Sequence, residues 1–491
     1  MNWNITAPTD QQHFDPAEVF AAGMAQHQIA NTAYPIAHLT TMRPYRIPRS
    51  QVQAVAPLAW QEVDRLGLYV HVPFCEVRCG FCEYTVVDPA LIPSSENMYF
   101  DLLLKEFEAY RQALGTQTKT LIGFDIGGGT PSVASVQNIA RIVEAAQRSF
   151  ILPETVRMSI ETTPKIAAQQ PEKIQAYYDL GIRRISMGVQ TINVRLLQEV
   201  GRSATSIAYN YAAAEQIRKA GFERFNVDVM YGFAHQSLEG LEATLAHVIE
   251  LAPEYITLYR TRYKGTKIAA QAQYVELEDV NVQADLAKQQ LRAAGYDATP
   301  GKNTFVRRAA VEHGDAGTSD YLTERVINGT PYLGLGLGAQ SLSPHTLAYN
   351  SGAADKRLEH YRAQVEAGLL PIQDLYHLSL EAAMAKMISV SFYFGEIDLG
   401  AFQQKFGLTL EQAFPAEVDY LLKENLMQYA AGPDGTARSL RLTETGVYSY
   451  NGTIALFYAG AVKQHLLEMS AEQAFVIPVF SGETARRLAV S

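Results

Sequence analysis

The stretch from Gly67 to Val87 reads GLYVHVPFCEVRCGFCEYTVV and contains every cysteine of this 491-residue chain. Cys75, Cys79 and Cys82 lie within one window of eight residues. Three cysteines placed at random over such a length would seldom gather so closely, so the spacing indicates a shared purpose. The pattern Cys-x3-Cys-x2-Cys supplies three thiolates from one loop, and it predicts a metal centre.

The number of thiolates separates the kinds of metal centre. Three thiolates cannot close the tetrahedral shell of a structural zinc, which needs a fourth Cys or His, and the nearby His71 falls inside a predicted strand at 68–72. Three thiolates suit a [4Fe–4S] cube that keeps one iron open for a substrate or cofactor. The iron–sulfur interpretation is therefore favoured, with a zinc site and a chance grouping of core thiols as the alternatives.

The same motif resembles a known family. Cys75-x3-Cys79-x2-Cys82, with Phe81 before the last cysteine, is similar to the signature of the radical S-adenosylmethionine (SAM) enzymes. The longer string YVHVPFC at 69–75 resembles the branch that contains the oxygen-independent coproporphyrinogen III oxidases. The resemblance implies a [4Fe–4S] cluster whose open iron binds SAM, and reductive cleavage of SAM to a 5′-deoxyadenosyl radical.

Composition sets the broad class. The chain is 47% hydrophobic and 19% charged, with a net charge of −10, which is typical of an acidic globular protein and unlike a nucleic-acid-coating one. No apolar run reaches the length of about 18 residues needed to span a bilayer, and the N-terminus lacks the features of a signal peptide. Free cysteines favour a reducing compartment. We expect a cytoplasmic enzyme that contacts neither nucleic acid nor membrane.

A repeated βα rhythm runs from Leu68 to about Pro300. Helical periodicity ends at Gly115, and later helices are expected to end at 180–181, 220–221 and 294–295. Strands are expected at Leu68–Val72, Leu121–Ile126, Val156–Glu161, Ile185–Gly188, Phe225–Asp228 and Tyr255–Tyr259. Five or six such units predict an α/β fold with a full or partial (β/α) barrel. The resemblance selects the partial (β/α)6 form.

Polar or glycine-rich residues close nearly every predicted strand. The cysteine loop, the segment GGGTPS at 127–132, Glu161, Gln190 and Asp228 all occupy such ends. One acid alone at a strand end is more often a helix cap. Because parallel strands of a barrel end on one rim, we expect these five sites to lie together.

The resemblance also assigns roles residue by residue. Tyr69 and Phe81 match aromatic positions beside SAM and the cluster, and Gly128, Gly129 and Thr130 match the segment whose backbone meets the SAM amino group. Glu161 matches an acid of the family's Ser-Ile-Glu segment. Positions that contact the ribose and carboxylate of SAM are matched by Gln190, Arg202 and Asp228. No catalytic residue is assigned.

The expected organisation has four parts: an N-terminal arm at 1–60, the radical SAM core at 61–300, a connecting segment at 301–374 and a C-terminal accessory domain at 375–491. The arm carries Arg43, Arg46 and Arg49, which suit an anion or simply a solvated surface. The string YLGLGLGA at 332–339 lacks the context of a dinucleotide site and is interpreted as a close-packed turn. Helices and a hairpin around 432–435 form the accessory domain, which is too weakly basic for DNA and is interpreted as a lid.

One departure from the family pattern bears on the reaction. The coproporphyrinogen oxidases carry a fourth cysteine and then an asparagine after the motif, where this chain has Tyr84 and Thr85. The wider branch includes class C methyltransferases that use two SAM molecules, haem-degrading enzymes and haem chaperones. We therefore expect a monomeric enzyme with a bulky conjugated substrate and an electron donor such as a flavodoxin or ferredoxin. It would transfer one carbon with a second SAM or decarboxylate a porphyrinogen, and haem carriage without turnover is the alternative.

Overall fold

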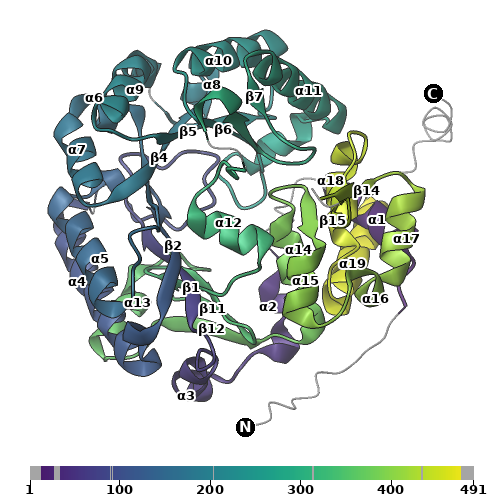
Figure 1. Cartoon of the computed structure of the whole chain (residues 1–491), viewed down its shortest axis with the longest axis horizontal. Coiled ribbons are helices and arrows are strands. Elements are labelled where there is room, and N and C mark those ends of the chain that lie inside the picture. The colour runs from purple at the N-terminus through teal and green to yellow at the C-terminus, as the bar shows by residue number, and fades with distance from the viewer. Residues whose placement is uncertain are drawn as a thin grey trace.

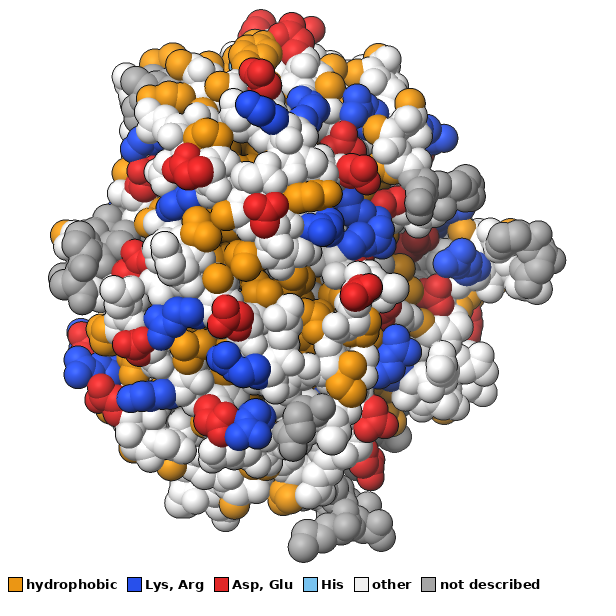
Figure 2. All heavy atoms as spheres, turned by 60° about the vertical axis from the view of Figure 1, so that its left-hand side comes forward, with side chains coloured by type: hydrophobic (Ala, Val, Ile, Leu, Met, Phe, Trp, Pro, Cys, Tyr) orange, Lys and Arg blue, Asp and Glu red, His pale blue; other side chains and the backbone are white. Residues whose placement is uncertain are grey.

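The computed structural model describes residues 13–26, 34–88, 90, 92–202, 204–311, 314–432 and 435–476. Within these ranges, no helix combines the length and the apolar character that crossing a membrane requires. The face shown in Figure 2 mixes acidic and basic side chains, with hydrophobic side chains gathered in a hollow near its centre.

Six parallel strands form the centre of the molecule and follow one another in chain order across the sheet. Each of the six predicted strands is present, extended by a few residues at one or both ends, except that β3 begins two residues later than predicted. The strands are β1 (Arg65–Val72), β2 (Thr120–Gly128), β3 (Met158–Thr162), β4 (Ile182–Gln190), β5 (Arg224–Tyr231) and β6 (Tyr255–Arg260).

Helices that connect these strands cover the outside of the sheet (Figure 1). They are α4 (Ile92–Leu114), α5 (Val136–Ser149), α6 (Pro164–Gln169), α7 (Pro171–Asp179), α8 (Val194–Glu199), α9 (Asn210–Lys219), α10 (Leu238–Glu250) and α11 (Leu277–Ala293). Gly115 ends α4 as predicted, with a φ of 60° that a residue with a side chain seldom adopts. The predicted α/β class and six-unit rhythm are confirmed.

The sheet continues beyond the six strands on both sides. Next to β1 lies the parallel β9 (Tyr332–Leu335), followed by antiparallel β10 (Gln340–Leu342), β11 (Thr346–Asn350) and β12 (Ile372–His377). Next to β6 lie β8 (Thr304–Arg307) and β7 (Tyr296–Asp297). In the part of the chain that the structure describes, the two edge strands do not pair, so the sheet is a partial barrel.

Helix α12 (Asp320–Ile327) packs against β1 and β2 and lies in the middle of the ring in Figure 1. Two glycines permit this contact. A Cβ atom at Gly123 would lie 2.3 Å from backbone atoms of Tyr321, and one at Gly67 would lie 2.7 Å from the Tyr321 ring. The helix therefore fills the interior near the start of these two strands and forms a floor under the strand ends.

The string YLGLGLGA is close-packed, as predicted. A Cβ atom at Gly334 would lie 2.2 Å from the carbonyl oxygen of Gln340, and one at Gly336 would lie 2.5 Å from the Tyr99 hydroxyl. The buried Glu106 carboxylate accepts hydrogen bonds from the Gly336 N–H and the Tyr361 hydroxyl, at 2.8 and 2.5 Å. These contacts fasten the connecting segment to α4.

The C-terminal part is mostly helical and has a core of its own. It contains α14 (Leu380–Ser391), α15 (Leu399–Phe406), α16 (Leu410–Ala413), α17 (Pro415–Lys423), α18 (Tyr450–Ala455) and α19 (Gly460–Val476). A small antiparallel sheet joins β13 (Glu396–Asp398), β15 (Ala437–Leu442) and β14 (Met427–Ala431), which confirms the predicted hairpin strands. Positions 433–434 of the hairpin lie outside the described residues.

The N-terminal segment packs on this C-terminal core. Helix α1 (Pro16–Ala25) contacts α18 and α19, while α2 (His38–Thr41) and α3 (Val52–Leu58) lead to β1, and α13 (Leu358–Glu366) precedes β12. Tyr34 is fully buried, and its carbonyl accepts a hydrogen bond from Lys386 at 2.7 Å. Of the three arginines of the arm, Arg46 pairs with the buried Asp374. This arginine therefore has a structural partner within the fold.

Candidate functional site

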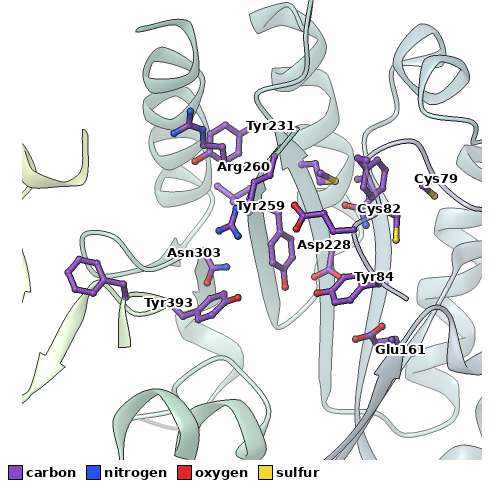
Figure 3. A pocket seen from close by; sticks show the side chains of 18 of the residues that line it. Cys79, Cys82, Tyr84, Glu161, Asp228, Tyr231, Tyr259, Arg260, Asn303 and Tyr393 are labelled. Carbon is purple, nitrogen blue, oxygen red and sulfur yellow. The ribbon is translucent and has the colours of Figure 1, made fainter. Parts of the chain in front are cut away.

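One cavity of about 1230 Å³ opens at the carboxyl ends of the parallel strands. Figure 3 shows part of its wall. All twelve residues predicted from the sequence line this cavity: Tyr69, Cys75, Cys79, Phe81, Cys82, Gly128, Gly129, Thr130, Glu161, Gln190, Arg202 and Asp228. The structure thus brings the predicted residues together on one rim, whereas their individual roles stay predictions.

The cysteine loop follows β1 and is held at several points along its backbone. The Val87 N–H donates to the Pro73 carbonyl at 2.8 Å and closes the base of the loop. In the middle, the Gly80 N–H donates to Val200 at 2.8 Å, and the Gly80 carbonyl accepts from Lys267 at 3.0 Å. These bonds fix the loop to the segments that follow β4 and β6.

The three sulfur atoms are free thiols with different neighbours. Arg202 Nε donates to Cys79 Sγ at 3.2 Å, and Cys75 Sγ lies 3.6 Å from the Thr130 hydroxyl. Burial raises the pKa of Cys75 to about 12 and also raises the pKa of Cys82. Burial thus disfavours the thiolate forms of Cys75 and Cys82, and coordination to a metal group would offset this cost.

The donor set fits a multi-iron group better than a single ion. Among the described residues, no three His, Cys, Asp or Glu side chains converge closely enough to hold one metal ion. Both ring nitrogens of His71 already have neighbours, with Nε2 2.7 Å from the Thr85 carbonyl and Nδ1 3.3 Å from the Tyr69 hydroxyl. A cube takes each thiolate at a separate corner and therefore does not require the sulfurs to meet at one point.

The segment after β2 lies directly against the cysteine loop. The Gly129 N–H donates to Val72 at 2.9 Å, and the Thr130 N–H donates to Phe74 at 2.6 Å. A Cβ atom at Gly129 would lie 2.5 Å from the Phe74 carbonyl oxygen and 2.9 Å from Cys75 Sγ. Glycine is required here because any side chain would push the two loops apart.

Two acids, Glu161 of β3 and Asp228 of β5, line the same cavity from either side of β4. The Glu161 side chain is open to the cavity, whereas Asp228 accepts hydrogen bonds from Asn226 at 2.7 Å and Ser186 at 3.2 Å. The surrounding protein raises the pKa of Glu161 to about 8, mainly through burial and then through the nearby charges of Asp228 and Asp125. Burial also raises the pKa of Asp228. A cationic ligand would relieve both effects.

Gln190 ends β4 in an unusual backbone conformation, with a φ of 68°. Its buried Oε1 atom has no hydrogen-bond partner among the described residues. An unpaired buried acceptor is costly, and it suits a ligand that offers an O–H or N–H donor. The unpaired Oε1 atom of Gln190 therefore suits a nucleoside ligand, whose hydroxyl groups can donate to it.

Arg202 connects β4 to the cysteine loop. Besides its bond to Cys79, its NH1 group donates to the Gly188 carbonyl at 2.9 Å, and the guanidinium lies 5.7 Å from the centre of the Phe81 ring. Tyr69 stacks on Tyr321 of α12 with ring centres 6.0 Å apart. The contacts of Arg202 with the loop were not foreseen from the sequence, which suggested only a contact with SAM.

Several residues of the cavity wall were missed by the sequence analysis. Tyr84 and Tyr259 are 63% and 41% exposed, and both line the cavity. Cationic residues of the wall were also missed, among them Arg260, Arg262 and Lys302. The string LYRTRY at 258–263, with two arginines after a predicted strand, is the one signal that was available.

Comparisons with known proteins identify a domain and relatives of this chain. Residues 69–248 match the model of the radical SAM superfamily. The haem chaperone HemW of Haemophilus influenzae is 31% identical over 198 residues, which are 40% of this chain and 50% of that protein. The chain thus aligns with about half the length of this chaperone and of that of Lactococcus lactis.

Longer alignments connect the chain with the coproporphyrinogen oxidases. The oxygen-independent coproporphyrinogen III oxidase of Cereibacter sphaeroides is 26% identical over 385 residues, covering 74% of this chain and 80% of that one. The coproporphyrinogen III oxidase HemN of Escherichia coli, a radical SAM enzyme, shares the fold with a TM-score of 0.69 and 22% identity, over 87% of this chain and 96% of that one. The chain therefore contains a radical SAM domain at residues 69–248, is similar over about three quarters of its length to proteins named as coproporphyrinogen III oxidases, and shares the fold of HemN.

Proposed function

We propose that this protein is an enzyme that binds a [4Fe–4S] cluster through Cys75, Cys79 and Cys82 and binds SAM beside it, for use on a bulky conjugated small molecule. The observation that carries this proposal is the convergence of the three thiols with Glu161 and Asp228 on one cavity. When bound, the cluster and SAM supply a 5′-deoxyadenosyl radical by reductive cleavage.

The chain's own residues position the reactants. The backbone of Gly128 and Gly129 lies against the cysteine loop and leaves room for the amino acid part of SAM. Glu161 offers a carboxylate for the ammonium group, while Gln190 and Asp228 offer acceptors for ribose hydroxyls. The floor formed by α12 closes the interior end of the cavity and helps to exclude water from it.

The volume of the cavity supports a bulky substrate. At about 1230 Å³, it exceeds the range of about 300–1,000 Å³ that is usual for small-molecule sites. The space suits SAM together with a second molecule. Tyrosine side chains that face it, including Tyr84 and Tyr259, suit a flat conjugated partner.

Two reactions fit this site, and we favour class C-type one-carbon transfer with a second SAM over oxidative decarboxylation of a porphyrinogen. Tyr84 stands where the coproporphyrinogen oxidases have their fourth cysteine, and its ring is exposed toward the cavity. A phenol in place of a thiol changes the surroundings of the substrate beside the cluster loop. This difference supports a reaction other than that of the oxidases.

Haem carriage without turnover is the second candidate, and it is supported by the similarity to proteins named haem chaperones. One experiment separates the candidates. Anaerobically reconstituted protein is given dithionite and SAM, and 5′-deoxyadenosine is measured against protein without dithionite. Steady formation supports catalysis, whereas formation at background level supports a carrier. Mass analysis of an added tetrapyrrole then distinguishes gain of one carbon from loss of carbon dioxide.

The affinity for SAM should rise with pH because of Glu161. Its pKa of about 8 means that the carboxyl is mostly protonated in the ligand-free protein at neutral pH, so binding an ammonium group must first remove this proton. Between about pH 6 and pH 7, where the SAM amine stays charged, we expect Kd to fall about tenfold. Equilibrium dialysis measures this change, and E161Q is the control with no carboxyl to titrate. An equal slope in E161Q would reject the assignment.

A further inference from the structure

Tyr84 is the second residue after the last cysteine, and it lines the cavity. Burial raises the pKa of Cys82, and the Tyr84 N–H, which donates toward this thiol, partly offsets the rise. In Figure 3, the Tyr84 ring lies between Cys82 and Glu161 and extends toward Tyr393. Burial also raises the pKa of Tyr84, and Tyr393, Glu161 and Cys82 raise it further, so these groups are neighbours in space.

The backbone on both sides of Tyr84 is fixed by hydrogen bonds. Lys356 donates to the Glu83 carbonyl at 2.9 Å, and the Thr85 carbonyl lies 2.7 Å from His71 Nε2. Two such bonds, one on each side of a residue, restrict the positions that its ring can reach. The Tyr84 phenol is therefore kept beside the cysteine loop.

The Tyr84 hydroxyl has no hydrogen-bond partner among the described residues, and the residue is 63% exposed. Other tyrosines of the cavity are engaged. Tyr448 donates to Asp285 at 2.7 and 2.8 Å, and the Tyr69 hydroxyl lies 3.3 Å from His71 Nδ1. A hydroxyl that is held beside a site without a partner is available to a ligand or to a reaction.

A phenol is a good donor of a hydrogen atom. Its O–H bond is weaker than the C–H bonds of saturated carbon, so transfer of this hydrogen to an alkyl radical is downhill in energy. The ordinary tyrosine pKa of about 10 keeps the hydrogen in place at neutral pH. A carbon radical that forms beside the cysteine loop therefore meets an O–H group that the fold has already positioned there.

We propose that Tyr84 is a catalytic residue that donates the hydrogen atom of its phenol to carbon radicals formed beside the cysteine loop. The proposal rests on the proposed function, because the cluster and SAM supply the first radical. In the transfer, the O–H bond breaks, a C–H bond forms and Tyr84 becomes a neutral phenoxyl radical. One electron from the reduced cluster, recharged by its low-potential donor or by dithionite, and one proton from water then restore the phenol.

The acceptor of this hydrogen depends on what the cavity holds. Without a substrate, the acceptor is the 5′-deoxyadenosyl radical itself, and the transfer protects the protein from uncontrolled oxidation. With a substrate bound, the acceptor is the radical left on the substrate. The product then gains one hydrogen that came from water through the exchangeable O–H group of Tyr84.

The test uses the full chain, reconstituted anaerobically in heavy water and given dithionite and SAM without a substrate. Phenol hydrogens exchange with heavy water and hydrogens on saturated carbon do not, so one deuterium in the 5′-deoxyadenosine reports an exchangeable donor. We expect this label in the parent protein and its loss in Y84F, which keeps the ring and lacks only the hydroxyl. Mass spectrometry measures the label, and the iron content shows that each protein is loaded.

Y448F is the matched control, because Tyr448 lines the same cavity but its hydroxyl is bound to Asp285. It should keep the label. A second readout is a phenoxyl signal in electron paramagnetic resonance spectra of samples frozen during the reaction. This signal should be present in the parent protein and in Y448F and absent from Y84F.

Unlabelled 5′-deoxyadenosine from the parent protein, or a label that persists in Y84F, would overturn the proposal. Loss of the label in Y259F with its retention in Y84F would also overturn it and would assign the donor to Tyr259, which is 41% exposed in the same cavity. A label that disappears equally in Y84F and Y448F has the same consequence, because that result reports a general change in the cavity.

The same samples separate this proposal from the proposed function. If the parent protein forms no 5′-deoxyadenosine, the radical chemistry is rejected, and the role of Tyr84 falls with it. If 5′-deoxyadenosine forms without the label, only the role of Tyr84 is rejected. A labelled product that loses its label in Y84F alone supports both.

Discussion

Replacing Cys79 by Ala is expected to lower the iron and sulfide content of anaerobically reconstituted protein from about four of each per chain to almost none. With one thiolate missing, a cube has only two protein ligands, and Arg202 loses the sulfur to which it donates. The broad absorption band near about 400 nm should disappear with the iron. C75A and C82A should behave in the same way.

The matched control for this loss is V77A. Val77 lies in the same loop between two of the cysteines, and its side chain is 53% exposed. V77A should therefore keep its iron and its absorption band. One tightly bound zinc and no sulfide in parent protein purified without air would contradict the iron–sulfur assignment.

Replacing Asp228 by Ala is expected to weaken SAM binding about ten- to a hundredfold while the iron content stays normal. Asp228 lies within β5, three residues before the end of the strand rather than at its end as predicted, and it is held by Asn226 and Ser186, so its carboxylate is positioned before a ligand arrives. The loss of its charged hydrogen bonds to SAM corresponds to roughly 1.5–3 kcal/mol. Isothermal titration of the reconstituted protein with SAM measures the change.

D285A provides the comparison for this variant. Asp285 also lines the cavity, but it accepts hydrogen bonds from Tyr448 at 2.7 and 2.8 Å and belongs to α11 rather than to the strand ends. SAM affinity in D285A should match that of the parent protein. Equal affinity in D228A and D285A would remove Asp228 from the cofactor site and leave the cysteines as the secure part of it.

The parallel core and the composition of the rim were predictable because both depend on local patterns. Short branched strands alternate with helices, and parallel strands of one barrel end on the same side, so Glu161, Gln190 and Asp228 had to meet. The spacing of the cysteines alone was enough to predict where the proposed metal centre lies. These inferences needed no knowledge of contacts between distant segments.

The contribution of Arg262 and Lys302 to the cavity wall depends on contacts between distant segments. Arg262 and Lys302 are separated by forty positions and by α11, and both line the cavity in a structure where the β7–β8 loop is tied to Leu258 of β6. The interior position of α12 could likewise not be predicted from the sequence, because a helical pattern does not reveal which surface the helix covers. Its seat is marked by two glycines that belong to other elements, Gly67 and Gly123.

The interior seat of α12 also sets an order of events during synthesis of the chain. The helix begins about 190 residues after β2 ends, and ribosomes add about 5–20 residues per second. The inner faces of β1 and β2 therefore stay uncovered for roughly 10–40 s, until α12 has been synthesised. During that interval the nascent barrel exposes apolar strand surface that other chains or chaperones can bind, so the rate of translation between β2 and α12 bears directly on the yield of folded protein.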